Sequence, residues 1–467
     1  MKTLLLLLAC SGPALAVVPG LMGPLQALVA MLPQLFAVFL GLFGSLLSMA
    51  YWRDKARQHI KPLLALGLAA LAVLWATADH RQAVVATPTP RPVTVTNQSW
   101  ISFRGDLSGG GVGSIGSQPF GGKPKIQWMH LDKDGSDYLS SPVAINDRVY
   151  IGAALLTQVR AAGSIECIDA HDGHLLWRSL TRHPVFSSPI AAGGRVFCGE
   201  GLHENDDCKM YCLDASTGKT IWTASTHGHA EGTPTLHQGR LIFSAGGDGF
   251  YCVEEKTGTQ IWHSRCGHCD SSAAVGGGRV FLGTAYGDNA AVCLDFKSGK
   301  LLWKVPQNLP VWGHPALAQE RVFFGLGNGT FGEGAIKPAG AVVSLEAASG
   351  RPIWRQNLPD SVNTSLCVTG SELLCGCRDG YVYCLSAQDG SQRWKAFCGN
   401  PVLSSLVIQG DTVLAAGGDG RLHALDRSNG RERWAYLVSD VPCEASPMLN
   451  SGFLYLGGGS SVTCLSQ

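Results

Sequence analysis

Two neighbouring repeat units of this chain each carry a histidine and a carboxylate two residues apart, a combination that can bind metal. One unit contains His229 and Glu231, and the next contains His268 and Asp270. Residues two apart on a β-strand lie on the same face, so the four side chains can converge. Imidazole and carboxylate together suit zinc or another divalent cation. The sequence therefore predicts a metal site formed by these four residues, with a polar, hydrated channel rim as the alternative interpretation.

The two carboxylates belong to a larger set of residues that occupies one position in every repeat. Each member lies three residues before an apolar residue, where the innermost strand of a propeller blade would begin. The set comprises Leu139, Phe186, Glu231, Asp270, Trp312, Asn363, Leu403 and Glu444. We expect it to line the mouth of a central channel. Its polar and tryptophan members are the candidate residues for cofactor binding: Glu231, Asp270, Trp312, Asn363 and Glu444.

The elements that must position these residues are short strands that repeat along the chain. From Thr233 to Trp262, two alternating apolar runs flank a Gly-Asp-Gly turn, as expected for a β-hairpin. A ten-residue step from an apolar to a small residue, such as Pro234 to Ser244, occurs eight times. A four-residue step from glycine to tryptophan, such as Gly258 to Trp262, occurs seven times. These repeats predict an all-β protein built from eight similar units.

The two ends of the repeat array complement each other. The last unit lacks its glycine-tryptophan strand, because the sequence ends at Gln467, just after its third strand. The segment from Lys125 to His130, which contains Trp128, precedes the first full unit and has no strands of its own. Pairing of this segment with the last unit would close the ring without leaving open sheet edges. We expect residues 99–467 to form an eight-bladed β-propeller closed by N- and C-terminal strands.

Loops between the second and third strands of a unit should open on the same face as the channel mouth. They are longest in the first, second and fifth units, at Ala153 to Ser164, Glu200 to Lys209 and Leu326 to Ala339. Extra length on one face favours a binding surface there.

The first 98 residues have a different character from the repeats. Residues 1–22 form a signal-like apolar segment, in which Cys10 leaves a lipoprotein interpretation open. We expect residues 23–82 to form a transmembrane helical hairpin and residues 83–98 to form a stiff Pro/Thr-rich linker. The basic stretch from Arg53 to Lys61 should remain in the cytoplasm. This orientation places the propeller on the periplasmic or extracytoplasmic side of the membrane.

The charge balance argues against nucleic acid as a partner. The chain has 36 Lys and Arg residues against 35 Asp and Glu residues, with a formal net charge of +1. Its basic residues are scattered, whereas phosphate binding needs them gathered on one face.

Cysteine use suggests packing rather than disulfide formation. Six cysteines hold equivalent positions and should be small buried fillers: Cys167, Cys212, Cys252, Cys293, Cys384 and Cys464. The segment Cys266-Gly267-His268-Cys269 has the spacing of a redox dithiol but lacks the helix start that lowers a thiol pKa in such enzymes. Unpaired thiols in this number fit poorly with an oxidising outer compartment.

The repeats resemble a known family. Ile168 to Gly173 with Trp177, and Leu213 to Lys219 with Trp222, resemble the tryptophan-docking repeat of the quinoprotein, or PQQ-type, propellers. Trp100 to Gly105 is similar to the segment that leads into such propellers. The resemblance covers residues 99–467 and implies the fold more strongly than the activity.

The resemblance implies two functions, and a third stays open beside them. The first is a non-catalytic, membrane-tethered scaffold that binds proteins through the channel-mouth face, similar to the propeller lipoprotein of the outer-membrane β-barrel assembly machinery. The second is a membrane-bound dehydrogenase using PQQ and Ca²⁺, with Glu231, Asp270 and Asn363 as metal ligands and base. The third is a sugar- or ion-binding sensor. The chain has no adjacent cysteine pair of the kind those dehydrogenases place beside the quinone. We therefore favour a scaffold that needs no cofactor.

Overall fold

The computed structural model describes residues 120, 122–156, 161–203, 205–330 and 332–467. The chain separates into two compact units, Met1–Ala83 and Val84–Gln467, and the described residues all belong to the second. The expected signal-like segment, transmembrane hairpin and linker lie outside them. Within the described ranges, no helix is long and apolar enough to cross a membrane.

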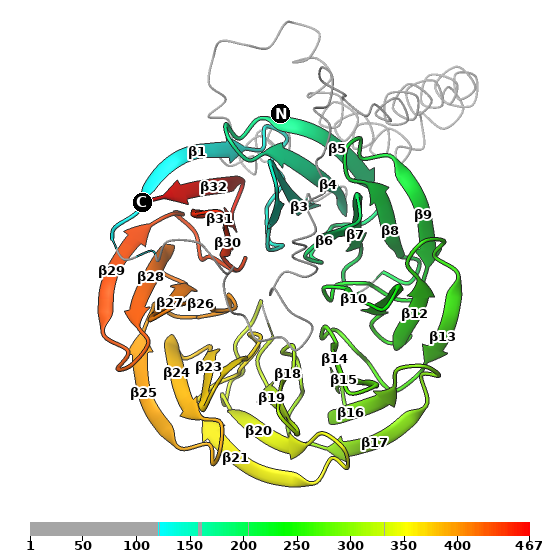
Figure 1. The fold of residues 1–467 in the computed structure, drawn as a ribbon, viewed down its shortest axis with the longest axis vertical. Helices are drawn as coiled ribbons and strands as arrows, with labels where there is room; N and C mark the ends of the chain where they lie inside the picture. The colour runs from blue at the N-terminus through cyan, green and yellow to red at the C-terminus, as the bar shows by residue number, and fades with distance from the viewer. Residues whose placement is uncertain (1–119, 121, 157–160, 204, 331) are drawn as a thin grey trace, which may run out of the picture. The chain divides into compact units, whose positions relative to one another are not determined.

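The described residues form eight antiparallel sheets of four strands, arranged as blades around a ring (Figure 1). Blades 1 and 2 contain β2 (Val143–Ile145), β3 (Arg148–Leu156), β4 (Ala161–Asp169), β5 (Leu175–Thr181), β6 (Ile190–Ala192), β7 (Arg195–Gly199), β8 (Lys209–Asp214) and β9 (Thr220–Ser225). Blades 3 and 4 contain β10 (Thr235–His237), β11 (Arg240–Ser244), β12 (Phe250–Glu254), β13 (Gln260–Ser264), β14 (Ala274–Gly276), β15 (Arg279–Thr284), β16 (Ala290–Asp295) and β17 (Leu301–Pro306).

The remaining blades follow the same order from the innermost to the outermost strand. Blades 5 and 6 contain β18 (Ala316–Ala318), β19 (Arg321–Gly327), β20 (Gly340–Glu346), β21 (Pro352–Leu358), β22 (Cys367–Thr369), β23 (Glu372–Gly376), β24 (Tyr381–Ser386) and β25 (Gln392–Phe397). Blades 7 and 8 contain β26 (Val407–Gln409), β27 (Thr412–Ala416), β28 (Arg421–Asp426), β29 (Glu432–Leu437), β30 (Met448–Asn450), β31 (Phe453–Gly458), β32 (Ser461–Ser466) and β1 (Lys125–Leu131).

Blade 8 combines strands from both ends of the repeat array, as the sequence predicts. The cyan strand β1 lies beside the red strand β32 in Figure 1, and Trp128 faces Cys464 across the pair. Beyond β1, the Asp132 amide donates to Ser460 O at 3.0 Å and the Tyr138 amide donates to Gly459 O at 2.7 Å. The eight-bladed, end-closed propeller is therefore confirmed.

Small residues on the third strand make room for the tryptophans of the fourth. Six cysteines, all fully buried, each lie opposite a tryptophan: Cys167 and Trp177, Cys212 and Trp222, Cys252 and Trp262, Cys293 and Trp303, Cys384 and Trp394, and Cys464 and Trp128. Ser344 and Ala424 take this place in blades 5 and 7. The cysteines are buried fillers as predicted, and burial raises the pKa of thiols such as Cys167 to about 12.

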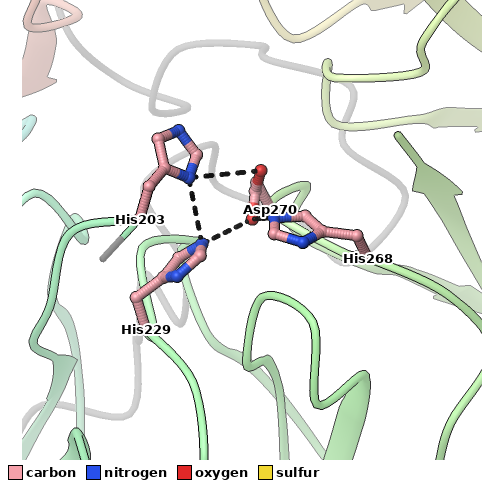
Figure 2. A group of neighbouring side chains, drawn as sticks. All are labelled: His203, His229, His268 and Asp270. Atoms are coloured by element: carbon pink, nitrogen blue, oxygen red, sulfur yellow. Dashed lines mark hydrogen bonds and ion pairs between the residues drawn. The ribbon is translucent and has the colours of Figure 1, made fainter. Parts of the chain in front are cut away.

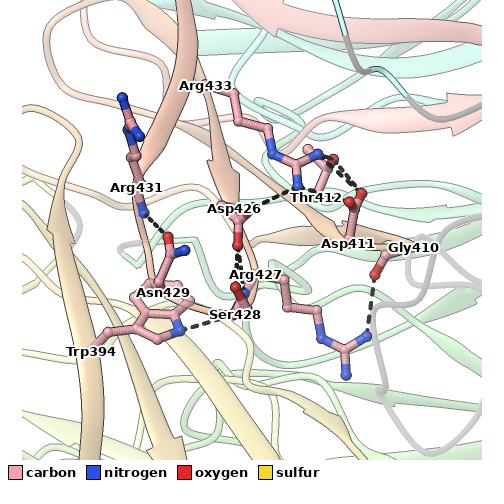
Figure 3. A network of polar contacts seen from close by, with 10 residues as sticks. All are labelled: Trp394, Gly410, Asp411, Thr412, Asp426, Arg427, Ser428, Asn429, Arg431 and Arg433. Carbon is pink, nitrogen blue, oxygen red and sulfur yellow. Dashed lines mark hydrogen bonds and ion pairs between the residues drawn. The ribbon is translucent and has the colours of Figure 1, made fainter.

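Seven of the eight fourth-strand tryptophans join their blade to the turn of the next, as Figure 3 shows for blades 6 and 7. Trp394 Nε1 donates to the Arg427 carbonyl at 2.9 Å, while Asp426 accepts the Ser428 amide at 2.9 Å and thereby holds the turn. Equivalent bonds join Trp128 to Ala170, Trp177 to Ala215, Trp222 to Glu255, Trp262 to Phe296, Trp303 to Ala347 and Trp354 to Ala387. The tryptophan and the acid that precedes the turn thus join neighbouring blades and hold the turn between them.

Candidate functional site at the channel mouth

A cavity of about 540 Å³ opens on the ring axis, and the predicted channel-mouth set lines it. Its lining includes all eight predicted positions: Leu139, Phe186, Glu231, Asp270, Trp312, Asn363, Leu403 and Glu444. They lie in the connections that lead from the outermost strand of one blade to the innermost strand of the next. Leu202 and His203 from blade 2, and Thr330 and Gly332 from blade 5, reach the same cavity. The long loops of these two blades therefore open on this face, as predicted.

A second ring of lining residues, which the sequence analysis missed, lies two positions further along the chain. Its members are Ser141, Ser188, Thr233, Ser272, His314, Ser365, Ser405 and Ser446. Several form a hydrogen-bonded chain from blade to blade, in which the Ser141, Ser405 and Ser446 amides donate to Ser188, Ser446 and Ser141 Oγ at 2.8–2.9 Å. The sequence feature that could have identified them is a Ser or Thr directly before the apolar residue in most units.

Three histidines and one aspartate from blades 2, 3 and 4 meet at one side of this mouth (Figure 2). His229 Nε2 lies 2.8 Å and His268 Nε2 lies 3.0 Å from Asp270 Oδ1. His203 Nδ1 lies 3.3 Å from His229 Nε2 and 4.0 Å from Asp270 Oδ2. The structure thus brings together three members of the predicted metal set and adds His203, from the loop between β7 and β8.

Glu231, the fourth member of the predicted metal set, lies near this cluster but is not part of it. Its ligand atoms fall outside the group in which all four atoms lie within 4.8 Å of one another. Burial and the nearby Asp270 charge raise the pKa of Glu231 well above its usual value, against a smaller lowering by the His203 amide. Burial also acts to raise the pKa of Asp270, but hydrogen bonds and charge from His229 and His268 lower it to about 2.

The remaining candidate residues occupy other sectors of the mouth. Trp312 Nε1 donates to Gly327 O at 3.1 Å, and Asn363 Nδ2 donates to Gly329 O at 3.1 Å, so both hold the blade 5 loop. Burial raises the pKa of Glu444, although Arg378 acts to lower it. These three residues line the cavity without joining the histidine cluster.

The dithiol segment, Cys266 to Cys269, contains His268 of the cluster. Cys266 and Cys269 Sγ lie 3.6 Å apart, and both side chains are buried. The hydrogen bond between the two thiols lowers the pKa of Cys266, whereas burial raises the pKa of Cys269. His268, between them in sequence, points instead to Asp270.

A sequence model of the family described as outer membrane protein assembly factor BamB matches residues 161–269, 250–332 and 338–465. These matches cover more than half of the chain and seven of the eight blades nearly in full. The chain belongs to the BamB family. The predicted resemblance to PQQ-repeat propellers is therefore confirmed.

Relatives of two kinds share this repeat. The outer membrane protein assembly factor BamB of Burkholderia pseudomallei (strain K96243) is 24% identical over 245 residues, which span 49% of this chain and 58% of that protein. The dehydrogenase subunit of the quinone alcohol dehydrogenase of Gluconacetobacter polyoxogenes is 28% identical over 166 residues, spanning 29% of this chain and 22% of that protein. The matches thus span less than two thirds of either relative.

Solved structures of both kinds share the fold. BamB from Moraxella catarrhalis superposes with a TM-score of 0.57 at 13% identity, covering 74% of this chain and 100% of that chain. The quinohemoprotein alcohol dehydrogenase from Comamonas testosteroni superposes with a TM-score of 0.64 at 13% identity, covering 79% of this chain and 80% of that chain. At such identity the likeness shows the BamB-family fold and leaves function to the chemistry of the site.

Proposed function

We propose that this chain is a non-catalytic scaffold that binds protein partners through its channel-mouth face, tethered to the outer side of a membrane by its N-terminal segments. The observation that carries the proposal is a cavity at the channel mouth that residues of all eight blades line, many of them with hydroxyl groups. Tyr286, Ile336 and Val441 are exposed on loops at this end of the ring. An exposed aromatic side chain such as Tyr286 beside a concave site is typical of protein interfaces. The assembly role named for the Burkholderia relative supports this choice.

The lining chemistry supports a scaffold over a quinone enzyme. PQQ is a polycarboxylate and needs cationic partners, yet no lysine or arginine is among the described residues that line the cavity. Glu231, Asp270 and Glu444 instead place carboxyl groups there. Like charges in a partly buried site disfavour binding of an anion. The residues of this mouth therefore do not fit the quinone.

Quinone titration tests the enzymatic alternative directly. PQQ and Ca²⁺ are added to the purified full-length chain, and the quinone absorbance and dye reduction with alcohols or sugars are followed. We expect no saturable absorbance change and no dye reduction, because no lysine or arginine among the described lining residues pairs with the carboxylates of the quinone. A saturable change accompanied by turnover would contradict the scaffold assignment.

Partner capture tests the scaffold itself. The full-length chain captures proteins from membrane extracts, and the captured set is quantified for the wild type and for a variant combining Tyr286→Ser and Ile336→Ser. The control is Ile261→Ser, which removes an equally exposed apolar side chain from the outer strand β13. We expect at least a tenfold loss of specific partners in the mouth variant only, equivalent to about 1.4 kcal/mol. Equal capture by all three proteins would move the binding surface elsewhere.

A further inference from the structure

The histidine cluster at the mouth has the composition and spacing of a transition-metal site. We propose that one divalent ion of the zinc class binds to four ligands, His203, His229, His268 and Asp270. The four ligand atoms lie within 4.8 Å of one another and come from three blades (Figure 2). Ligands of a tetrahedral zinc ion with bonds of about 2.0–2.1 Å lie about 3.4 Å apart. The contacts of 2.8, 3.0 and 3.3 Å within the cluster lie below this value, and the 4.0 Å separation of His203 from Asp270 lies above it, so small shifts in both directions would accept the ion.

Hydrogen bonding within the cluster leaves buried polar atoms unsatisfied. Asp270 Oδ2 is buried and has no hydrogen-bond partner among the described residues, while Asp270 Oδ1 lies within 3.0 Å of both His229 Nε2 and His268 Nε2. His229 Nε2 faces both Asp270 and His203, and its single hydrogen cannot serve two directions. Unpaired polar atoms in a site that is 90% buried at Asp270 are costly. A cation at the centre of the cluster satisfies all of these lone pairs together.

The backbone holds the ligands in place without the metal. The Cys269 amide donates to Gly246 O at 3.0 Å and the Ala285 amide donates to His268 O at 3.0 Å, which fixes the segment that carries His268 and Asp270. The ring of His229 packs against Gly246, where an added Cβ would lie 2.4 Å from His229 Cε1. This close approach needs glycine, because any larger residue would displace the imidazole. The ligands His229, His268 and Asp270 are thus preorganised.

His203 is the fourth ligand and the most exposed of the four. Its side chain is 41% exposed, compared with 2% for His229. Tyr286 OH lies 3.2 Å from His203 Nε2, so it can orient the ring while Nδ1 faces the cluster. Binding of the ion would tie the blade 2 loop to blades 3 and 4 and so fix one side of the mouth.

The donor set selects the class of ion. Three imidazole nitrogens and one carboxylate suit zinc, copper, nickel or iron, whereas Ca²⁺ and Mg²⁺ prefer oxygen ligands. The described cavity lining contains no lysine or arginine, so no fixed cation competes for the site. This assignment concerns metal affinity alone and does not depend on capture of any partner.

Metal analysis of the full-length protein tests the site. The chelator-treated protein is loaded with Zn²⁺, dialysed, and its zinc content and Kd are measured by mass spectrometry and dye competition. We expect one zinc per wild-type chain, and more than a 100-fold weaker Kd in His203→Ala and Asp270→Asn, because outer-shell losses alone cost about 10–100-fold. Ca²⁺ should not compete. The matched control is His174→Ala, from an exposed group with Asp169 and Asp172, which should leave the Kd unchanged.

Cobalt substitution gives a readout that is independent of affinity. Co²⁺ in the wild type should show the intense visible absorption of a tetrahedral site, and this band should disappear in His229→Ala. Circular dichroism checks folding, and if His229→Ala unfolds, the exposed-loop variant His203→Ala carries the test. Failure of the wild type to retain zinc, an unchanged Kd in His203→Ala, or displacement of zinc by Ca²⁺ would each overturn the site.

Discussion

Glycine has no Cβ, and this allows the glycine-containing turn of a blade to contact the tryptophan of the preceding blade. Gly258 has φ +71°, and a Cβ there would lie 2.6 Å from the Trp222 ring. Gly239 also has φ +71°, but nothing lies within 4 Å of its added Cβ. Alanine substitutions at Gly239 and Gly258 therefore separate the cost of backbone strain from the cost of displacing the Trp222 ring.

We predict that Gly239→Ala lowers the free energy of unfolding by about 1–2 kcal/mol, the strain of a left-handed alanine. Gly258→Ala should lose about 1–3 kcal/mol more, because the methyl group must displace the Trp222 ring. Urea denaturation of both variants measures the difference. Equal losses would show that the tryptophan contact has no energetic weight.

At the residue scale, the sequence predicted part of the site and missed part. Histidine and carboxylate two residues apart placed His229, His268 and Asp270 together, because equivalent positions of neighbouring blades meet at the mouth. His203 lies in a loop of irregular length, so no repeat position located it. Glu231 shares the repeat position of Asp270, yet the ligand geometry excludes it. The position of a residue in the repeat predicts its neighbours, but it does not predict the direction in which its side chain points.

At the scale of elements, a hydrogen bond from each tryptophan links one blade to the next at seven junctions. Trp434 differs, because its buried Nε1 has no acceptor among the described residues. Trp394 and Trp434 are similarly buried, at 8% and 9% exposure. The Gly430 turn also packs against the Trp394 ring, so the two positions differ in this turn contact as well as in the bond that Nε1 makes.

Replacing each ring by phenylalanine should reveal this difference. We predict that Trp394→Phe loses about 0.5–1.5 kcal/mol more than Trp434→Phe, because only the first substitution removes a hydrogen bond and leaves the Arg427 carbonyl unpaired. Chemical denaturation monitored by circular dichroism is the measurement. A larger loss in Trp434→Phe would contradict the docking role of the bond.

At the scale of elements, the prediction of a long loop in the first blade was wrong. The segment from Ala153 to Ser164 was expected to be a long loop, but β3 continues to Leu156 and β4 begins at Ala161. Both strands stay paired beyond the length of the repeat, from Ala153 opposite Ser164 to Leu156 opposite Ala161. Residues 153–162 contain no Gly, Pro, Asn or Asp to end the strands, and the spacing of the repeats alone could not show that pairing continues. The blade 2 and blade 5 loops, rich in Gly, Asn and Asp, did form as expected.

At the scale of the whole molecule, the ring depends on the junction between blades 8 and 1. Arg178 of β5 contacts Asp132 at 2.5 Å and Asp134 at 2.6 Å, both in the segment that follows β1. Its Nε also lies 2.8 Å from Glu166, which is fully buried and accepts a hydrogen bond from Tyr138. The Arg178 guanidinium therefore links the segment that follows β1 to blade 1.

We predict that Arg178→Met lowers the free energy of unfolding by about 3 kcal/mol, because it leaves the Glu166 charge buried without its partner. The control Arg351→Met removes an arginine that is 68% exposed and paired only with Glu346, and should change stability by less than about 0.5 kcal/mol. Urea denaturation measures both. Comparable small losses would show that ring closure does not rely on this cluster.

The same junction should make stability depend on acid. Burial acts to raise the pKa of Asp132, but hydrogen bonds from the Ser136 amide and Arg178 outweigh it and lower the pKa below its usual value. A lowered native pKa gives stability that is present above the unfolded value and is lost as pH falls through the native value. Thermal unfolding from neutral pH to about pH 3 should therefore show wild type and Asp132→Asn converging. A constant gap between them would refute this linkage.

Binding of partner proteins at the channel mouth is tested most directly by site-specific cross-linking. A photoreactive residue is placed in the full-length chain at Tyr286, which lines the mouth, or at Ile261 on the outer strand β13. The two positions are 53% and 41% exposed, so chance encounters should be similar. We predict discrete adducts with partner proteins from position 286 and none above background from position 261. Adducts from position 261 alone, or equal adducts from both, would contradict a mouth-face scaffold.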